Sequence, residues 1–193
     1  MFWIRTFTGG QFHFDDIYKN DIRIADIAHA LSNTCRFGGH CREFYSVAQH
    51  SLSVSRNVPK WARYPALLHD AAEAYIGDIV SPLKLQFAEM FCEGMGLSGS
   101  MISDLEERIR DHIFQSLHPD LMCFGDWEKE VEVADDRMLL AEARDLMEGG
   151  MDGFNSPYKP SPFPVKPEAP RVAEVKFLCA YFEIVKDSDH PVK

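Results

Sequence analysis

The 193-residue sequence contains no apolar run of the roughly 18 residues that a membrane-spanning helix requires. Its N-terminal residues also lack the charged and then apolar arrangement of a secretory signal peptide. We therefore expect a cytoplasmic protein that has no membrane partner.

Positive charge is also scarce. Lysine and arginine total 20 against 30 aspartates and glutamates, so the formal net charge is −10. Broad binding to nucleic acid needs a basic surface, and this composition argues against it. A small phosphorylated ligand is still compatible, because a few local cations and a metal ion can outweigh the overall field.

Cysteine residues are few, odd in number, and form no C-x-x-C pair. We expect reduced, mostly buried thiols rather than disulfides. Two of them lie beside His40 in one short segment, but no fourth partner is near, so we do not expect a zinc cluster there. The five residues are Cys35, Cys41, Cys92, Cys123 and Cys179.

The length and the pattern of apolar residues predict one all-α domain, a helical bundle with a short N-terminal β-hairpin. Two apolar segments flank Thr8-Gly9-Gly10, which is typical of a hairpin turn. After the hairpin, apolar residues recur at spacings of three and four, the period of a helix. The helices are expected at residues 24–33, 46–56, 60–75, 83–93, 99–117, 126–148 and 171–187.

We expect the single domain to span residues 1–193, with its core formed by residues 20–150. The proline-rich segment 156–170 is unsuited to regular structure. It and the C-terminal helix 171–187 form an appended element in this interpretation. The apolar stripe predicted for that helix consists of Val172, Val175, Leu178, Cys179, Phe182 and Val185.

His69 and Asp70 are adjacent at the end of the apolar segment Trp61–Tyr75. Burying two neighbouring polar side chains among apolar residues costs free energy unless a partner binds them. A divalent metal would do so, since imidazole nitrogen and carboxylate oxygen are both good ligands.

Two further candidate ligands lie on the apolar faces of other predicted helices. His50 shares a face with Val47 and Val54, and Asp135 lies beside the inner stripe of the acidic helix 126–148. A lone histidine on such a face is more often a core residue, and an acid on such a helix is more often solvated. Together with His69 and Asp70, however, they favour a four-ligand metal site in a bundle core.

Two carboxylates near this set are candidates for catalysis. Glu73 lies one helical turn after Asp70 and is suited to orient or deprotonate a water molecule. Asp78 follows in a loop, where a side chain can reach over a pocket. The alternative for Asp78 is a helix-capping or turn residue.

The segment Arg36-Phe37-Gly38-Gly39 could bind a nucleotide. Arginine can bind phosphate through paired donors, phenylalanine can stack on a base, and glycine permits close approach. The alternative is a connecting loop in which Phe37 fills the core. Lys84 and Arg42 are further candidates for phosphate contact, although such residues are more often simply exposed.

Together these residues resemble the HD-domain metal-dependent phosphohydrolases. More narrowly, the set is similar to the branch of bacterial 5′-deoxynucleotidases and phage dATP triphosphohydrolases, over about residues 3–148. The motifs are Arg36-Phe-Gly-Gly-His40, Tyr45-Ser-Val-Ala-Gln-His-Ser51, Leu68-His-Asp-Ala-Ala-Glu73, Gly77-Asp-Ile-Val-Ser-Pro-Leu-Lys84 and Ala134-Asp135.

The resemblance implies one divalent transition metal (Zn, Mn or Co) on His50, His69, Asp70 and Asp135, with Mg²⁺ as a second, substrate-associated ion. It assigns catalysis to Glu73 and Asp78. Substrate contacts are expected from Arg36, Phe37, Gly38 and Lys84. It also implies a homo-oligomer.

The implied activity is cleavage of the Pα–O5′ bond of a small-molecule deoxynucleotide. Phe37, where the bacterial nucleotidases carry tryptophan, and Gln49, where they carry glutamate, favour the phage-type branch. The preferred substrate is therefore a deoxynucleoside triphosphate, above all dATP, giving deoxynucleoside plus triphosphate in a bacterial or phage-infected cytoplasm. The alternative is a 5′-deoxynucleotidase acting on monophosphates, and a non-catalytic nucleotide sensor is the less favoured third interpretation.

Overall fold

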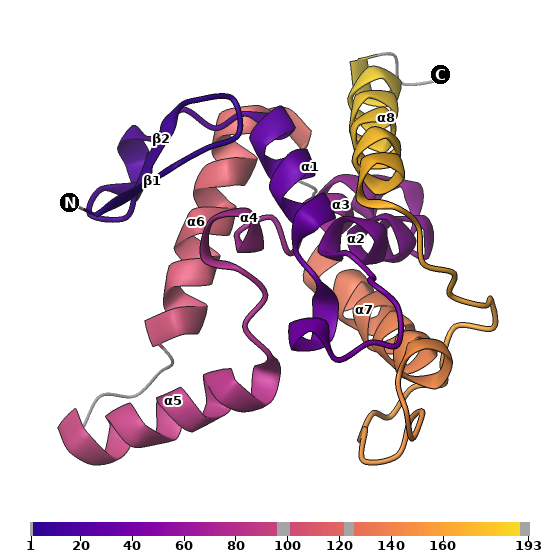
Figure 1. The fold of residues 1–193 in the computed structure, drawn as a ribbon. Coiled ribbons are helices and arrows are strands. Elements are labelled where there is room, and N and C mark those ends of the chain that lie inside the picture. Colours follow the sequence, from indigo (N-terminus) through magenta and orange to yellow (C-terminus); the bar gives the residue numbers. More distant parts are fainter. Residues whose placement is uncertain (1, 96–100, 122–125, 190–193) are drawn as a thin grey trace.

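The computed structural model describes residues 2–95, 101–121 and 126–189 and has a mostly helical fold with a short antiparallel hairpin at its start (Figure 1). The fold class expected from the sequence is confirmed at this level. The elements are β1 (Trp3–Arg5), β2 (Gln11–His13), η1 (Ile17–Lys19), α1 (Ile24–Asn33), η2 (Arg36–Gly39), α2 (Val47–Arg56), η3 (Lys60–Ala62), α3 (Arg63–Leu68), α4 (Glu73–Ile76), α5 (Ser81–Met95), α6 (Met101–Leu117), η4 (Pro119–Leu121), α7 (Trp127–Leu146) and α8 (Pro170–Asp189).

None of the described helices combines the length and the apolar character needed to cross a bilayer.

The hairpin is attached to the bundle by one buried ring and one buried carboxylate. In β2, Phe12 pairs with Ile4 of β1 and stacks on Tyr75 with 3.9 Å between ring centroids. Asp26 of α1 accepts hydrogen bonds from the backbone N–H and the hydroxyl of Thr8 in the hairpin turn, at 2.6 and 3.0 Å. These contacts hold the hairpin against α1 and α4.

The prediction of one continuous helix over residues 60–75 is wrong. The segment consists of the short turn η3, the helix α3, a tight turn and the single-turn helix α4. In the tight turn, the N–H of Ala71 donates to the carbonyl of Leu68, and that of Glu73 donates to the carbonyl of Asp70, both at 3.0 Å. This i to i−3 pattern winds the chain more tightly than an α-helix. It separates α3 from α4 at His69 and Asp70, and Ala71 stays buried.

The other expected helices agree with the observed ones to within one or two residues at each described end. The first two residues of the helix expected at 99–117 lie outside the described residues. The cysteine expectation was wrong in part: Cys35 and Cys41 are half-buried and Cys179 is exposed, all three without a disulfide. The side chains of Cys92 and Cys123 lie outside the described part of the chain.

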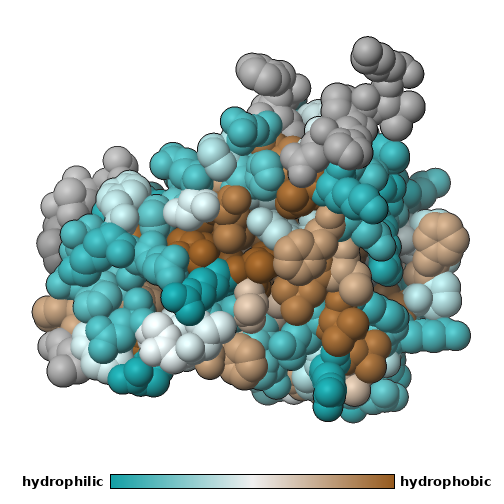
Figure 2. Space-filling model, turned by 90° about the horizontal axis from the view of Figure 1, so that it is seen from above, coloured by the Kyte–Doolittle hydropathy of each residue, from teal (hydrophilic) through white to brown (hydrophobic). Residues whose placement is uncertain are grey.

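Helix α8 packs against α1, α2 and α3 and contributes to the main core, so it is no outer appendage. The stripe predicted for it is wrong at four positions, among them the exposed Cys179, because the buried residues are Ala173, Phe177 and Tyr181. Val172, Val175 and Phe182 are exposed instead. This helix carries apolar residues on two sides, and periodicity alone does not distinguish them. Seen from above, apolar residues gather near the centre of the molecule with hydrophilic residues around them (Figure 2).

The proline-rich segment before α8 is hydrogen-bonded to α2 and α7, two helices that carry candidate site residues. The side-chain amide of Gln49 in α2 donates to the carbonyl of Lys166 and accepts from the N–H of Glu168, at 2.5 and 3.0 Å. On α7, Arg144 donates to the carbonyl of Ser161 at 3.0 Å, and Asp145 accepts from the N–H of Val165 at 2.8 Å. The segment therefore joins α2 to α7.

We expect Gln49→Glu to destabilise the protein, because a carboxylate accepts hydrogen bonds but cannot donate to the Lys166 carbonyl. Leaving that acceptor facing a negative charge should cost about 1–3 kcal/mol and lower the Tm by about 3–10 °C. Thermal unfolding measures the effect. Gln115→Glu, an exposed position on α6, serves as the matched control. Equal Tm values for the two variants would show that the Gln49 bonds do not stabilise the fold.

Candidate metal centre

Three separate parts of the chain bring four candidate ligands to one place. His50 lies in the middle of α2, His69 and Asp70 lie in the turn after α3, and Asp135 lies on α7. Helix α2 packs on both α3 and α7, so these elements form one wall of the bundle. The serine at the start of α2, Ser46, accepts from the N–H of Gln49 and fixes that helix end.

The ligand atoms converge on one point. The Nε2 atom of His50 lies 3.0 Å from Oδ1 of Asp135, 3.3 Å from Nε2 of His69 and 3.6 Å from Oδ2 of Asp70. His69 Nε2 lies 3.3 Å from that same Asp70 oxygen. His50, His69 and Asp135 each offer one ligand atom within 4.8 Å of the others. Asp70 is not part of this group of three, although its Oδ2 lies close to the Nε2 atoms of both histidines.

Each imidazole is oriented by a hydrogen bond from its other nitrogen. His50 Nδ1 lies 2.7 Å from Oε1 of Glu142, and His69 Nδ1 lies 2.8 Å from the carbonyl oxygen of Ala66. Both partners are acceptors, so each Nδ1 carries a proton and each ring turns its Nε2 towards the shared point. This arrangement of the distal nitrogen is typical of metal-ligating histidines.

The charge distribution at this point requires a cation. Two Nε2 lone pairs and two carboxylates face one another, and acceptors at such distances repel unless a proton or a metal ion lies between them. Burial and Arg36 lower the pKa of His50, but Glu142 and Asp135 raise it more, to about 10. Without a metal, a proton on His50 therefore supplies the missing positive charge. The donor set fits a divalent ion of the Zn, Mn or Co type.

Glu142 is a residue that the sequence interpretation missed. Its fully buried carboxylate accepts from His50, from the hydroxyl of Tyr45 at 3.0 Å and from Nε of Arg36 at 3.1 Å. Burial raises the pKa of Glu142, but His50 and Arg36 together lower it below its usual range. One signal could have revealed it: Glu142 lies two helical turns after Asp135 and therefore shares its face.

The expected substrate-binding segment lies beside the ligands. The guanidinium of Arg36 contacts Oδ2 of Asp70 at 3.5 Å as well as Glu142, so it pairs with acids of the site. Phe37 has φ 56° and ψ 31°, a left-handed conformation that is costly for a residue with a side chain. Its ring lies against Phe154, with 6.4 Å between centroids. Arg36, Phe37 and Gly38 are not among the residues that line the cavity described below.

Glu73 and Asp78 occupy different positions relative to the ligands. Glu73 begins α4, is buried, and its Oε2 has no hydrogen-bond partner among the described residues. Burial and repulsion by Asp70 and Asp78 raise the pKa of Glu73 to about 10. Asp78 lies in the loop between α4 and α5, and burial raises its pKa despite the nearby Arg36. Both carboxyl groups therefore hold protons more readily than usual.

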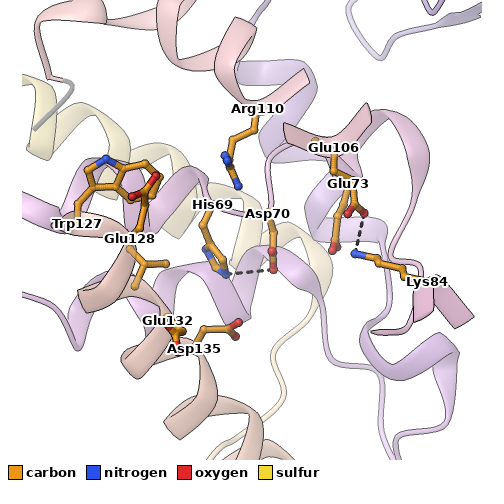
Figure 3. A pocket seen from close by; sticks show the side chains of 12 residues that line it. His69, Asp70, Glu73, Lys84, Glu106, Arg110, Trp127, Glu128, Glu132 and Asp135 are labelled. Atoms are coloured by element: carbon orange, nitrogen blue, oxygen red, sulfur yellow. Dashed lines mark ion pairs between the residues drawn. The ribbon is translucent and has the colours of Figure 1, made fainter. Parts of the chain in front are cut away.

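A cavity of about 320 Å³ opens next to the ligands (Figure 3). The ligand side contributes His69, Asp70 and Asp135, and the other walls come from α5, α6 and the first turns of α7. Lys84, expected at the site, reaches this cavity. The sequence analysis did not predict the residues that form the other walls. The residue pattern of the helices that carry them indicates long helices facing solvent. The full lining is His69, Asp70, Ala72, Glu73, Lys84, Glu106, Arg110, Trp127, Glu128, Val131, Glu132 and Asp135.

The pKa of Glu73 predicts a stability effect in the metal-free protein. The folded chain keeps this proton up to about pH 10, whereas the unfolded chain loses it near pH 4.5. Between these values the unfolded state binds fewer protons, so wild-type stability falls as the pH rises. Glutamine needs no proton. We therefore expect Glu73→Gln to raise the Tm at pH 8 by about 3–10 °C and to have less effect near pH 4.

Thermal unfolding in the presence of a chelator, from pH 4 to pH 9, measures this difference. Glu43→Gln is the control, because Glu43 is exposed. A Tm difference between Glu73→Gln and wild type that does not grow with pH would contradict a raised pKa at Glu73.

No protein-family model matches the chain. It is 55% identical over 84 residues to the uncharacterized protein YfdR of Escherichia coli K12. This match covers 44% of the chain and 47% of that relative. It is 38% identical over 101 residues to the uncharacterized protein RCAP_rcc00048 of Rhodobacter capsulatus, covering 47% of the chain and 51% of that relative. The matched regions thus span about half the length of these curated relatives.

Proposed function

We propose that this protein is an HD-type metal-dependent phosphohydrolase that cleaves the Pα–O5′ bond of deoxynucleotides. One observation carries the proposal: two oriented imidazole nitrogens and the carboxylates of Asp70 and Asp135 converge at the edge of a cavity that also holds cationic side chains. The resemblance described for the sequence supports the same activity.

A divalent ion on His50, His69, Asp70 and Asp135 would supply Lewis acidity and bring the pKa of a water molecule towards neutrality. Glu73 lies at the cavity wall, where it would orient the attacking water. Without a metal its pKa is raised to about 10, in part by Asp70, and a cation bound to Asp70 would lower that pKa so that the Glu73 carboxylate could take the proton of the water. Asp78, whose raised pKa suits a proton donor, would protonate the departing O5′. Lys84 and Arg110 at the cavity would offset the charge of the phosphoryl oxygens.

The same bond is cleaved in both candidate substrates. A triphosphate such as dATP, which the phage-like motifs favour, would give deoxyadenosine and triphosphate. A monophosphate would give deoxynucleoside and phosphate. A homo-oligomer with only small-molecule partners completes the proposal.

Chromatographic product analysis tests this function. The purified protein is incubated with Mn²⁺, Co²⁺, Zn²⁺ or Mg²⁺ and with each dNTP, dNMP and rNTP, and chelator-treated protein is the control. Formation of a deoxynucleoside only in the presence of metal is the expected result. If every metal and substrate leaves the nucleotides intact while a nucleotide still binds, the protein is a sensor and the catalytic proposal fails.

A further inference from the structure

A second cavity, of about 720 Å³, lies between α8 and the segment that joins α2 to α3. It is larger than the cavity beside the metal ligands, which has about 320 Å³. None of the described residues that line the second cavity also lines the first, and none is a candidate metal ligand. The proposed phosphohydrolase activity therefore gives this second cavity no role.

The second cavity is positively charged although the chain is acidic. The formal net charge of the chain is −10, whereas four of the described lining residues are lysine or arginine and two are acidic. The two lysines are already paired. Lys60 lies 3.6 Å from Asp187, and Lys176 pairs with Glu168 of the proline-rich segment. The two arginines therefore supply the charge that a ligand would meet.

These arginines are Arg56 at the end of α2 and Arg63 at the beginning of α3. Neither guanidinium forms an ion pair with a residue that the structure describes, and Nε of Arg63 is buried without a hydrogen-bond partner among those residues. The second lining acid, Glu183, is exposed, so solvent screens its charge. A buried guanidinium N–H without a partner costs free energy, and an anionic oxygen would satisfy it.

The remaining lining is largely apolar and aromatic. The indole ring of Trp61 is 46% exposed, and Val175 on α8 is 54% exposed. Ala180 and Ile184 line the cavity from the same helix. Covering exposed apolar surface is favourable, and an indole ring stacks well on another planar ring. The lining therefore suits a ligand that combines an apolar ring with an anionic group.

We propose that the second cavity binds a small aromatic anion, a ring that carries a phosphate, sulfonate or carboxylate group. The anionic group contacts Arg63 and Arg56, whose guanidinium groups offer paired donors to its oxygens. The ring lies against Trp61 and the apolar side chains of α8. Because the lining includes no candidate metal ligand, binding here needs neither the metal nor catalysis.

Calorimetric titration with naphthalene-1-sulfonate tests this site, because the probe has an anionic group and a ring but no phosphoester bond to cleave. Mn²⁺-loaded wild type should bind it. Loss of a charge-assisted hydrogen bond should weaken binding about 10- to 100-fold in Arg63→Gln, and Arg63→Lys should recover part of the affinity. Arg108→Gln, an exposed arginine on α6, should stay within about twofold of wild type. Equal affinities of Arg63→Gln and Arg108→Gln would overturn the assignment of Arg63.

Two further titrations test the charge and the location. The uncharged ring compound 1-naphthylmethanol should bind at least tenfold more weakly than the sulfonate, because it lacks the charge that the arginines attract. Equal affinities of the two compounds would show that the site does not select an anion. The sulfonate should bind equally with Mn²⁺ and with a chelator. Binding that requires Mn²⁺ would place the probe at the metal centre and overturn the proposal.

Two substitutions at exposed positions keep the test decisive if Arg63→Gln does not fold, which circular dichroism detects. Arg56→Gln and Trp61→Ala should each weaken binding of the sulfonate at least threefold, through lost charge and lost stacking. Unchanged affinity in both variants would overturn the proposal. A wild type that binds the sulfonate but hydrolyses no nucleotide would contradict only the proposed function.

Discussion

His69→Ala is expected to abolish metal binding and to lower kcat at least 1,000-fold. The substitution removes one of two oriented Nε2 donors and leaves two carboxylates with His50 at the site. A three-donor site that has also lost its fixed geometry should hold a divalent ion far more weakly. The side chain is nearly buried but lies at the cavity edge, so its removal should leave the fold intact.

Metal content and thermal unfolding measure this effect together. A ligand present at about 100 times its Kd stabilises the folded state by about 2.7 kcal/mol, which raises the Tm of a chain of this size by about 5–10 °C. Mn²⁺ or Zn²⁺ should give this shift in wild type and in the control His40→Ala, an exposed histidine outside the cluster. A shift of the same size in His69→Ala would contradict the assignment of His69 as a ligand.

Glu142→Gln is expected to weaken metal binding about 10- to 100-fold and to destabilise the protein by about 2–5 kcal/mol. Glutamine can still accept from His50, but it no longer supplies the negative charge that Arg36 and the His50 ring face inside the bundle. The remaining charged partner of Arg36 is Asp70, at 3.5 Å. Asp70 would then be drawn towards Arg36 and away from the metal.

Two readouts distinguish this effect from a general loss of stability. Metal affinity is measured at a temperature where the variant is fully folded, and unfolding is followed separately with and without chelator. Glu130→Gln, an exposed glutamate on the same helix, should change neither quantity. If Glu142→Gln lowers the Tm but leaves metal affinity unchanged, Glu142 is a structural residue only and does not orient His50.

The candidate ligands could be found from the sequence because each one departs from a local pattern. His50 and Asp135 lie on apolar helical faces, and His69 and Asp70 end an apolar segment. A polar group at a buried position needs a partner wherever the helix packs, so the departure is informative without knowledge of the neighbours. The spacing of apolar residues likewise predicted the helical fold class.

The partners of those residues could not be found in this way. Arg110 and Glu142 lie on helices that carry many charged residues, and what distinguishes them is which helix packs against them. The buried face of α8 was misassigned for the same reason, since both of its sides are apolar and only packing against α1, α2 and α3 selects Ala173 and Phe177.

The sequence by itself thus determined the helical class, the net charge and the identity of the metal-ligand candidates, because helical periodicity and burial of polar groups are local properties. Only the tertiary structure decided three further features: the break between α3 and α4 at His69, the ion pair of Arg36 with Glu142, and the cavity that α5, α6 and α7 form beside the ligands. Each depends on distances between segments that are far apart in the chain, and packing alone fixes those distances.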